Sequence, residues 1–288
     1  MDILAFFLAL GAALSWSLCG VINKVALESS DWLALNIVRA ASACLLLFPY
    51  LIFSVGPSHL SLEMVFLAGV TGVLVLTGGL SLYFLALGKS SLHRISPVAS
   101  TSRFWAVLTP ILFLGEEPTI VVFSSVFLII LGTYLLSPEE GRESQIKWTG
   151  LFLALGAGVL WGAPTALNKY CLADGMPPAA FLSFMVAFGV LANGILFSAI
   201  RIRRGKAFEM VSLGWGVLSG VLGLFVGQLL WQFSLKMEVA SVVSPVVGAK
   251  IPFVFIFSVL LLDESPSKRA FFGMSLVFLA VFILSLWG

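Results

Sequence analysis

The sequence predicts an all-α polytopic membrane protein with ten transmembrane helices arranged as two inverted-topology five-helix repeats. Three observations predict this class. The chain of 288 residues is 60% hydrophobic and 10% charged, with a mean hydropathy of +1.09, whereas a soluble domain carries about 25% charged residues. Ten apolar runs, each about 20 residues long, follow one another along the chain. The opening of the first half recurs in the second half.

The ten apolar runs leave no stretch for a soluble domain. Both faces of each run are apolar, so closed helices are expected in place of the alternating strands of a barrel. The first run follows Met1 and Asp2 without a basic segment, which indicates a mature span and not a cleaved signal. The expected spans are residues 3–24, 32–54, 63–87, 95–115, 119–137, 149–170, 179–200, 212–235, 242–262 and 269–287.

An internal repeat organises these spans. Residues 8–27 read LALGAALSWSLCGVINKVAL, and residues 153–172 read LALGAGVLWGAPTALNKYCL. Nine of these twenty positions match at an offset of 145, and later matches follow an offset of 148. Because five spans is an odd number, the second copy must cross the membrane in the opposite sense, as in secondary transporters. We therefore expect five-helix repeats at residues 1–138 and 149–288, joined by a loop at residues 139–148.

The two openings, together with GEEP at residues 115–118 and DESP at residues 263–266, resemble the EamA-type transporters of the drug/metabolite transporter superfamily. The resemblance covers essentially the whole chain. It implies a carrier of small organic metabolites that works by alternating access, and it leaves the substrate open. It also implies a central cavity lined by the first, third, fourth, sixth, eighth and ninth spans, near Trp16, Tyr83, Arg103, Trp161, Trp231 and Lys250.

Three basic residues lie inside apolar runs, whereas all fourteen Asp and Glu fall in loops or at span ends. Arg39 lies in the second run, Arg103 in the fourth and Lys250 in the ninth. A charge at bilayer depth costs about 2.5 kcal/mol or more, and a buried cation without a carboxylate needs an anion, a backbone carbonyl or water. We expect the substrate, an organic anion or an amino acid, to supply a carboxylate or phosphate to these residues. The alternative is that they bond to carbonyls exposed at proline kinks or extend to the membrane surface.

Aromatic, amide and proline residues complete the candidate site. Indole and phenol rings with a polar tip suit a partly apolar ligand, although helix packing or lipid contact is the alternative. The expected substrate-binding residues, besides the three cations, are Trp16, Trp161, Tyr83, Gln228, Trp231 and Gln232. Prolines kink helices, and Asn near a span end can cap or cross-link helices. The expected structural or gating residues are Asn23, Asn168, Pro97, Pro110, Pro245 and Pro252.

The distribution of Lys and Arg predicts the orientation in a cytoplasmic (inner) membrane. Cytoplasmic loops carry an excess of these residues. One side of the predicted bundle holds ten of them against one, Lys236, on the other, when Lys24 and Lys169 are left out because both lie at span ends, one on each side. Both termini are therefore expected outside. The ten are Lys89, Arg94, Arg142, Lys147, Arg201, Arg203, Arg204, Lys206, Lys268 and Arg269.

Residue chemistry also narrows the function. No carboxylate lies in mid-span, which disfavours a cation exporter, carboxylate-based proton coupling and an intramembrane enzyme. The open alternatives are an exporter of neutral or zwitterionic amino acids with structural basic residues, and a flippase of an anionic lipid-linked sugar. We expect no catalytic residue, metal, cofactor or nucleic-acid partner. The expected partners are a small-molecule substrate and the lipid bilayer, and a chain that holds both repeats can act as a monomer.

Overall fold

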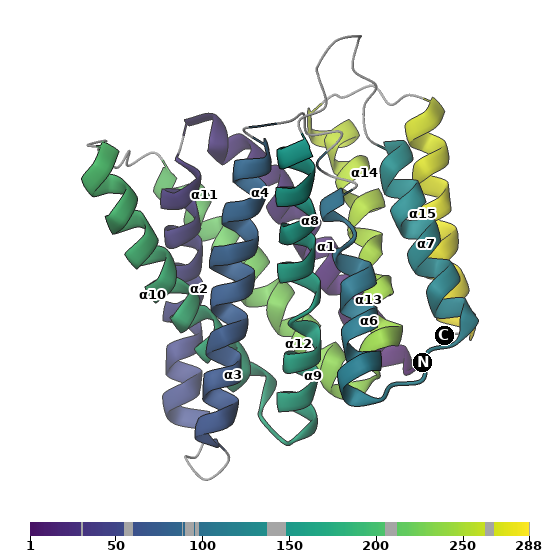
Figure 1. Cartoon of the computed structure of the whole chain (residues 1–288), viewed down its shortest axis with the longest axis horizontal. Coiled ribbons are helices and arrows are strands. Elements are labelled where there is room, and N and C mark those ends of the chain that lie inside the picture. The colour runs from purple at the N-terminus through teal and green to yellow at the C-terminus, as the bar shows by residue number, and fades with distance from the viewer. Residues whose placement is uncertain are drawn as a thin grey trace.

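The computed structural model describes residues 1–29, 31–54, 60–87, 89, 95, 98–136, 148–204, 212–262 and 268–287. Within these residues the regular structure is helical throughout, and the helices lie side by side as a bundle (Figure 1). The first half of the chain forms α1 (Ile3–Ser29), α2 (Trp32–Ser54), α3 (Leu62–Gly72), η2 (Val73–Gly79), α4 (Leu80–Leu87), α6 (Ser102–Leu114) and α7 (Ile120–Leu136). The second half forms α8 (Trp148–Gly162), α9 (Thr165–Ala173), α10 (Pro178–Arg204), α11 (Ser212–Ser219), η3 (Gly220–Gly227), α12 (Gln228–Met237), α13 (Ala240–Val246), η4 (Val247–Ala249), α14 (Lys250–Leu262) and α15 (Lys268–Trp287).

In the part of the chain that the structure describes, six helical segments are long and apolar enough to cross a membrane. They are Ile3–Asn23, Trp32–Pro49, Leu62–Tyr83, Trp148–Ala173, Pro178–Ala199 and Leu213–Met237. The shorter apolar helices are Ser102–Leu114, Ile120–Leu135, Ala240–Val254 and Phe271–Leu284. The expected all-α polytopic class is thereby confirmed, whereas the full count of ten crossings and their inverted arrangement stay predictions.

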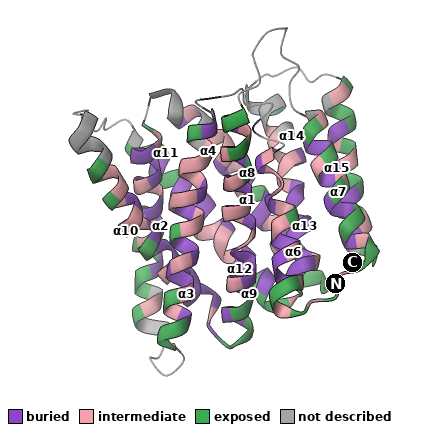
Figure 2. Ribbon diagram, in the orientation of Figure 1, coloured by how far each residue is buried: buried purple, intermediate pink, exposed green. Residues whose placement is uncertain are grey.

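Exposed residues occur along the helices of the bundle (Figure 2), and many of them are large apolar side chains. On α15, for example, Phe271, Phe272 and Trp287 are 60%, 59% and 63% exposed. Such an apolar surface is unfavourable in water and matches the hydrocarbon of a bilayer. The helices α7 and α15 pack along each other, and the Arg269 guanidinium lies 5.2 Å from the centre of the Tyr134 ring.

Small residues allow the helices to approach closely inside the bundle. Ala5, Ala9 and Ala12 lie on one face of α1 and are fully buried. At Gly72, a Cβ atom would run into the carbonyl oxygen of Met185 in α10. Packing through small residues is the usual device of membrane helices, because lipid supplies no hydrophobic drive between them.

Helices α3 and α4, and likewise α11 and α12, are joined by π-helical segments. The segment η2 covers Val73–Gly79 and η3 covers Gly220–Gly227. At the offset of 148, Val75 of η2 corresponds to Gly223 of η3 and Gly79 corresponds to Gly227. A π-helix pairs each N–H with the carbonyl five residues earlier, which leaves a local carbonyl open to other donors, and it often marks a functional site.

Polar groups close one end of the bundle, the end at which both termini lie (lower end in Figure 1). The Glu116 carboxylate accepts bonds from the backbone N–H groups of Ala240 (2.9 Å) and Ser241 (2.7 Å) at the start of α13. Lys169 Nζ donates to the carbonyls of Leu235 (2.8 Å) and Glu238 (2.7 Å) at the end of α12. An anion at a helix N-terminus and a cation at a C-terminus both oppose the helix dipole, so these contacts stabilise this end.

Candidate functional site

The three basic residues of the apolar runs lie on neighbouring helices. Arg39 of α2, Arg103 of α6 and Lys250 of α14 are all half-buried. The Lys250 carbonyl accepts a bond from Ser17 Oγ of α1 (3.0 Å), and Arg39 Nη2 lies 3.5 Å from Cys19 Sγ, two residues further along α1. The helix α6, which carries Arg103, packs against α13, which precedes η4 and Lys250. Like charges on neighbouring helices of both halves are costly without a compensating anion.

The contacts of Arg39 satisfy only part of its guanidinium. One terminal nitrogen, Nη2, lies 3.5 Å from Cys19 Sγ of α1, and a neutral thiol is a weak acceptor. Its Nε atom is buried and has no hydrogen-bond partner among the described residues. An unsatisfied donor raises the free energy of the protein in a membrane interior, so Arg39 can bind a further acceptor.

Breaks in two helices position the other two cations. The helix α6 begins at Ser102, directly after a turn in which the Arg103 N–H bonds to the Ser100 carbonyl (3.2 Å). The helix α14 begins at Lys250, directly after the 3₁₀ segment η4. At the offset of 148, Ser102 corresponds to Lys250, so the breaks fall at equivalent positions. Such mid-helix 3₁₀ turns often mark functional hinges.

Two of the expected prolines, Pro245 and Pro252, lie close to the break before α14. Pro110 is inside α6 and Pro245 is inside α13, upstream of η4, and Pro252 is the third residue of α14. Pro97 lies outside the described residues. A proline removes a backbone donor and bends the helix around it, which accounts for a divided helix between Ala240 and Leu262.

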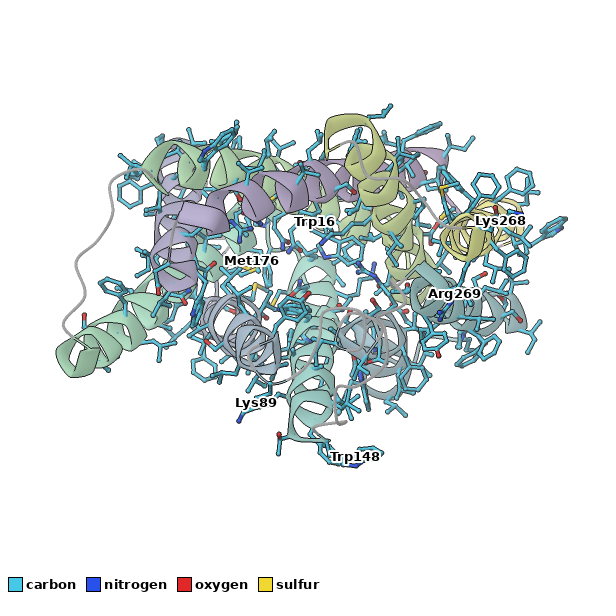
Figure 3. The ribbon with its side chains drawn as sticks, turned by 90° about the horizontal axis from the view of Figure 1, so that it is seen from above. Trp16, Lys89, Trp148, Met176, Lys268 and Arg269 are labelled. Atoms are coloured by element: carbon cyan, nitrogen blue, oxygen red, sulfur yellow. The ribbon has the colours of Figure 1, made fainter. Side chains whose placement is uncertain are left out.

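Two aromatic pairs extend the site. The rings of Trp16 and Trp231 lie 6.3 Å apart between centroids, and those of Tyr83 and Trp161 lie 5.2 Å apart. Figure 3 shows Trp16 within the bundle, whereas Lys89 and Trp148 project away from it. Trp16 and Trp161 are repeat equivalents, and so are Tyr83 and Trp231. Each pair therefore joins an aromatic residue of one half to one of the other half.

Both indoles donate to the π-helical segment of the opposite half. Trp16 Nε1 donates to the Gly223 carbonyl (2.8 Å), and Trp161 Nε1 donates to the Val75 carbonyl (3.2 Å). A Cβ atom at Gly227 would lie 2.7 Å from the Trp16 ring, which explains a glycine at this close approach. The carbonyls that the π geometry leaves open are thus the acceptors of the two tryptophans.

The amide side chains differ in their burial and hydrogen bonding. Gln232 is fully buried, and neither its amide nitrogen nor its amide oxygen has a hydrogen-bond partner within the described part of the chain. Gln228 is half-buried. Asn23 Oδ1 accepts a bond from Ser219 Oγ (2.6 Å), which joins α1 to α11. The repeat equivalent Asn168 is buried, and its Oδ1 has no partner.

Several residues around the site were not singled out from the sequence. Cys19 lies 3.1 Å from Ser219 Oγ and contacts Arg39, so it connects the cation to the α1–α11 contact. Asn36 and Asn193 both donate to the Leu76 carbonyl in η2, at 2.9 and 3.2 Å. Their signal in the sequence is a polar side chain within an apolar run, which reveals depth in the membrane but not the partner.

Comparison with known proteins agrees with this architecture. The EamA-like transporter family matches residues 3–137 and 148–286. An uncharacterized transporter of Archaeoglobus fulgidus is 24% identical over 286 residues, which is 98% of this chain and 98% of that protein. A crystal structure with 15% sequence identity superposes with a TM-score of 0.81 over 98% of this chain and 96% of the other. At that identity the structural match shows a shared fold.

The chain belongs to the EamA-like transporter family. It is a multi-pass transmembrane transporter, in agreement with the resemblance seen in the sequence. Members of such a family work through binding of a small-molecule substrate within a lipid-embedded protein. The identity of that substrate is a question for the residues of the site.

Proposed function

We propose that this protein is a secondary transporter that moves a small organic anion, bearing a carboxylate or phosphate, across the cytoplasmic membrane by alternating access. The observation that carries the proposal is the presence of Arg39, Arg103 and Lys250 on neighbouring helices of a bundle whose apolar runs contain no mid-span carboxylate. Guanidinium groups bind carboxylate and phosphate with two parallel hydrogen bonds, and an ammonium adds a compact point charge.

The repeat supplies an internal comparison for the role of these cations. At the offset of 148, Arg103 corresponds to Ile251, and Lys250 corresponds to Ser102. For Arg39 the comparison comes from two equivalent glycines, Gly72 and Gly220. Gly220 packs against the backbone of Arg39, whereas Gly72 packs against the backbone of Met185. Each basic residue therefore has a neutral residue at its structural counterpart. The equivalent helices fold without the charge, which supports a role in binding.

The proposed architecture is ten spans in two inverted five-helix repeats, at residues 1–138 and 149–288 with a connecting loop at residues 139–148. The two stretches that match the family, residues 3–137 and 148–286, support this division. The matched indole bonds to Gly223 and Val75 support it as well, because residues related by the repeat make related contacts. The binding site of an inverted repeat lies near the membrane midplane, between the repeats.

The proposed orientation places both termini outside the cytoplasm. The helix α15 starts with the basic residues Lys268 and Arg269, and its start lies at the end of the bundle opposite the termini (Figure 1), which supports the assignment of that end to the cytoplasm. A reporter fused after Gly288 that is active only outside the cytoplasm would agree with this orientation.

The test compares transport and stability in the same variants. We expect Arg103→Gln and Lys250→Gln to abolish uptake of an organic anion by proteoliposomes while the protein remains at least as stable as the wild type. Burying a charge costs several kcal/mol, so a neutral side chain relieves the bundle. If the cations instead serve structure by bonding to carbonyls, the same variants lose stability and retain transport of neutral solutes.

Lys236→Gln is the matched control, because Lys236 is exposed at the terminal end of the bundle. This variant should transport as the wild type does. Full uptake by both Arg103→Gln and Lys250→Gln would defeat the anion proposal. A screen of anionic against neutral metabolites by thermal shift then identifies the solute, and preferential stabilisation by zwitterionic amino acids would support the alternative exporter.

A further inference from the structure

We infer, on the basis of the proposed function, that the transported anion carries two negative charges and that Arg39 selects the second charge. Arg39 and Lys250 both lie against the same stretch of α1, at Cys19 and Ser17, and α6 with Arg103 packs against α13. The interior positions supply no further carboxylate, because every Asp and Glu of the sequence lies in a loop or at a span end. A substrate with a single charge would neutralise one of these three half-buried cations and leave two without an anion.

Arg39 is the group with spare binding capacity. Its buried Nε has no partner, and its Nη2 meets only the thiol of Cys19 among the contacts of the described residues. It also comes from α2, a different helix from those of Arg103 and Lys250. A second anionic group, placed at some distance from the first, can therefore be bound by Arg39 while the first remains on Arg103 and Lys250.

The chemical class that fits is a short dicarboxylate or a phosphate monoester. A phosphate monoester carries a charge of about −1.5 to −2 at pH 7, and a dicarboxylate carries two. The Trp16–Trp231 and Tyr83–Trp161 pairs border the same interior with apolar rings, which suits the carbon skeleton between or beside the charged groups.

The experiment measures binding to purified protein for probes that differ in charge but hardly in shape. One series is succinate, succinamate and succinamide, and the other is ethyl phosphate and the monoanion of nearly the same shape, ethyl sulfate. We expect the dianion of at least one series to bind at least about tenfold more tightly than its monoanion, a ratio that corresponds to one additional charge-assisted bond. In Arg39→Gln this ratio should fall close to one while affinity for the monoanion is retained.

The outcomes separate this inference from the proposed function. Equal binding of dianion and monoanion in the wild type, or a ratio that Arg39→Gln leaves unchanged, overturns the selection by Arg39 and leaves the anion carrier intact. Equal binding of the neutral succinamide, or no binding of either dianion, overturns both. Lys236→Gln should keep the wild-type ratio, because its side chain lies outside the interior.

A second inference comes from an asymmetry in hydrogen bonding between the halves. Asn23 and Ser219 are bonded at 2.6 Å. Their repeat equivalents are Asn168 and Thr71, at offsets of 145 and 148. Among the described residues, Thr71 Oγ1 and Asn168 Oδ1 are both buried without a hydrogen-bond partner, although their helices α3 and α9 pack against each other. The chain thus forms one of two related bridges.

The geometry points to an exchange of bridges during transport. In the conformation of this structure α1 is tied to α11, and in the alternate conformation α9 is tied to α3 by the Thr71–Asn168 bond while the Asn23–Ser219 bond opens. Two arrangements related by the repeat have similar energies, which is what alternating access requires. In the present conformation the Thr71–Asn168 bridge is open, and its two buried oxygens carry the free-energy cost of lacking a hydrogen bond.

The native thiol of Cys19 reports on this exchange. It is 3% exposed and contacts Ser219, so it becomes accessible when the α1–α11 bridge opens. In a Cys44→Ala, Cys171→Ala background, Thr71→Val removes the donor of the second bridge and spares every contact of the first. We expect Thr71→Val to slow maleimide labelling of Cys19 about two- to tenfold, the range that one net hydrogen bond supports, and to lower the maximal rate of uptake with little change in KM.

Labelling of Cys19 at the wild-type rate in Thr71→Val would overturn the exchange. Asn168→Leu provides a second variant on the same bridge, and its effect on labelling must agree with that of Thr71→Val. Ser125→Ala is the control, because Ser125 Oγ is also buried without a partner but lies in α7. Ser125→Ala should leave the labelling rate unchanged.

Discussion

Substitution of Gly72 by Ala tests how tightly α3 and α10 are packed. The new Cβ atom would collide with the Met185 carbonyl oxygen and lie 3.2 Å from the Gly189 nitrogen. Both obstacles are backbone atoms, so no side-chain rotation relieves them. Overpacking costs about 1–3 kcal/mol, and Ala returns about 1 kcal/mol over Gly in a helix. We expect a net loss of about 2 kcal/mol, because the rigid obstacle places this site at the upper end of the range.

The measurement is thermal or detergent unfolding of purified protein. A loss of about 2 kcal/mol lowers the melting temperature by about 4 °C in a chain of this size class. Gly194→Ala is the matched control, because Gly194 also lies within a helix and no neighbouring atom lies within 4 Å of the position that a Cβ would take there. That variant should be as stable as the wild type or slightly more stable. Equal stability of Gly72→Ala and Gly194→Ala would refute the packing argument.

Three further predictions concern single contacts. Trp16→Phe and Trp161→Phe each leave a π-segment carbonyl without its donor, and each should cost about 0.5–1.5 kcal/mol in unfolding experiments; no loss in either variant contradicts the assigned bonds. Glu116→Gln should destabilise by about 1 kcal/mol through weaker capping of α13, whereas Glu117→Gln should not, because Glu117 is exposed. Gly115→Ala should cost about 1 kcal/mol in melting experiments, because Gly115 adopts φ +68° at the end of α6.

Helix positions could be predicted from the sequence because hydrophobic length is a local property. The expected span at residues 32–54 coincides with α2, and the expected span at residues 63–87 nearly coincides with the continuous α3–η2–α4 segment. The expected fourth span is divided, because α6 begins only at Ser102. A turn at this point depends on tertiary contacts, since α8 glycines such as Gly162 pack against its backbone.

The composition of the site could be predicted better than its partners. Arg103 and Lys250 stand out because a charge in an apolar run is rare. The repeat also places them one residue apart in register, near the starts of α6 and α14. The pairing of Trp16 with Trp231 and of Tyr83 with Trp161 depends on how α1 and α8 cross the π-segments. Sequence periodicity predicts the face of a helix, but it contains no information on which helix lies opposite.

The π-segments were beyond sequence reasoning for a related reason. A π-helix differs from an α-helix by a shift in hydrogen-bond register, which apolar residues neither favour nor forbid. The glycines of η2 and η3 predict close packing, and the structure shows that Gly79 and Gly227 admit the tryptophan rings. The hydrogen bonds of Trp16 and Trp161 to these segments then help to hold the altered register.

The π-segments also affect where these helices can lose or gain a residue. Each is equivalent to an α-helix that has accepted one additional residue, so a one-codon deletion within Val73–Gly79 would restore ordinary helical pairing. Because the wider π turn absorbs the additional residue locally, the helix beyond it would keep nearly the same rotation, and the main loss would be the open Val75 carbonyl that accepts from Trp161. A one-residue deletion at Leu80–Leu82, in ordinary α-helix, would instead turn the following residues by about 100° and shift them by about 1.5 Å, so Tyr83 would leave the Trp161 ring. Within this span, the π-segment is therefore the place where the length of the chain can change with the least effect on the flanking helices.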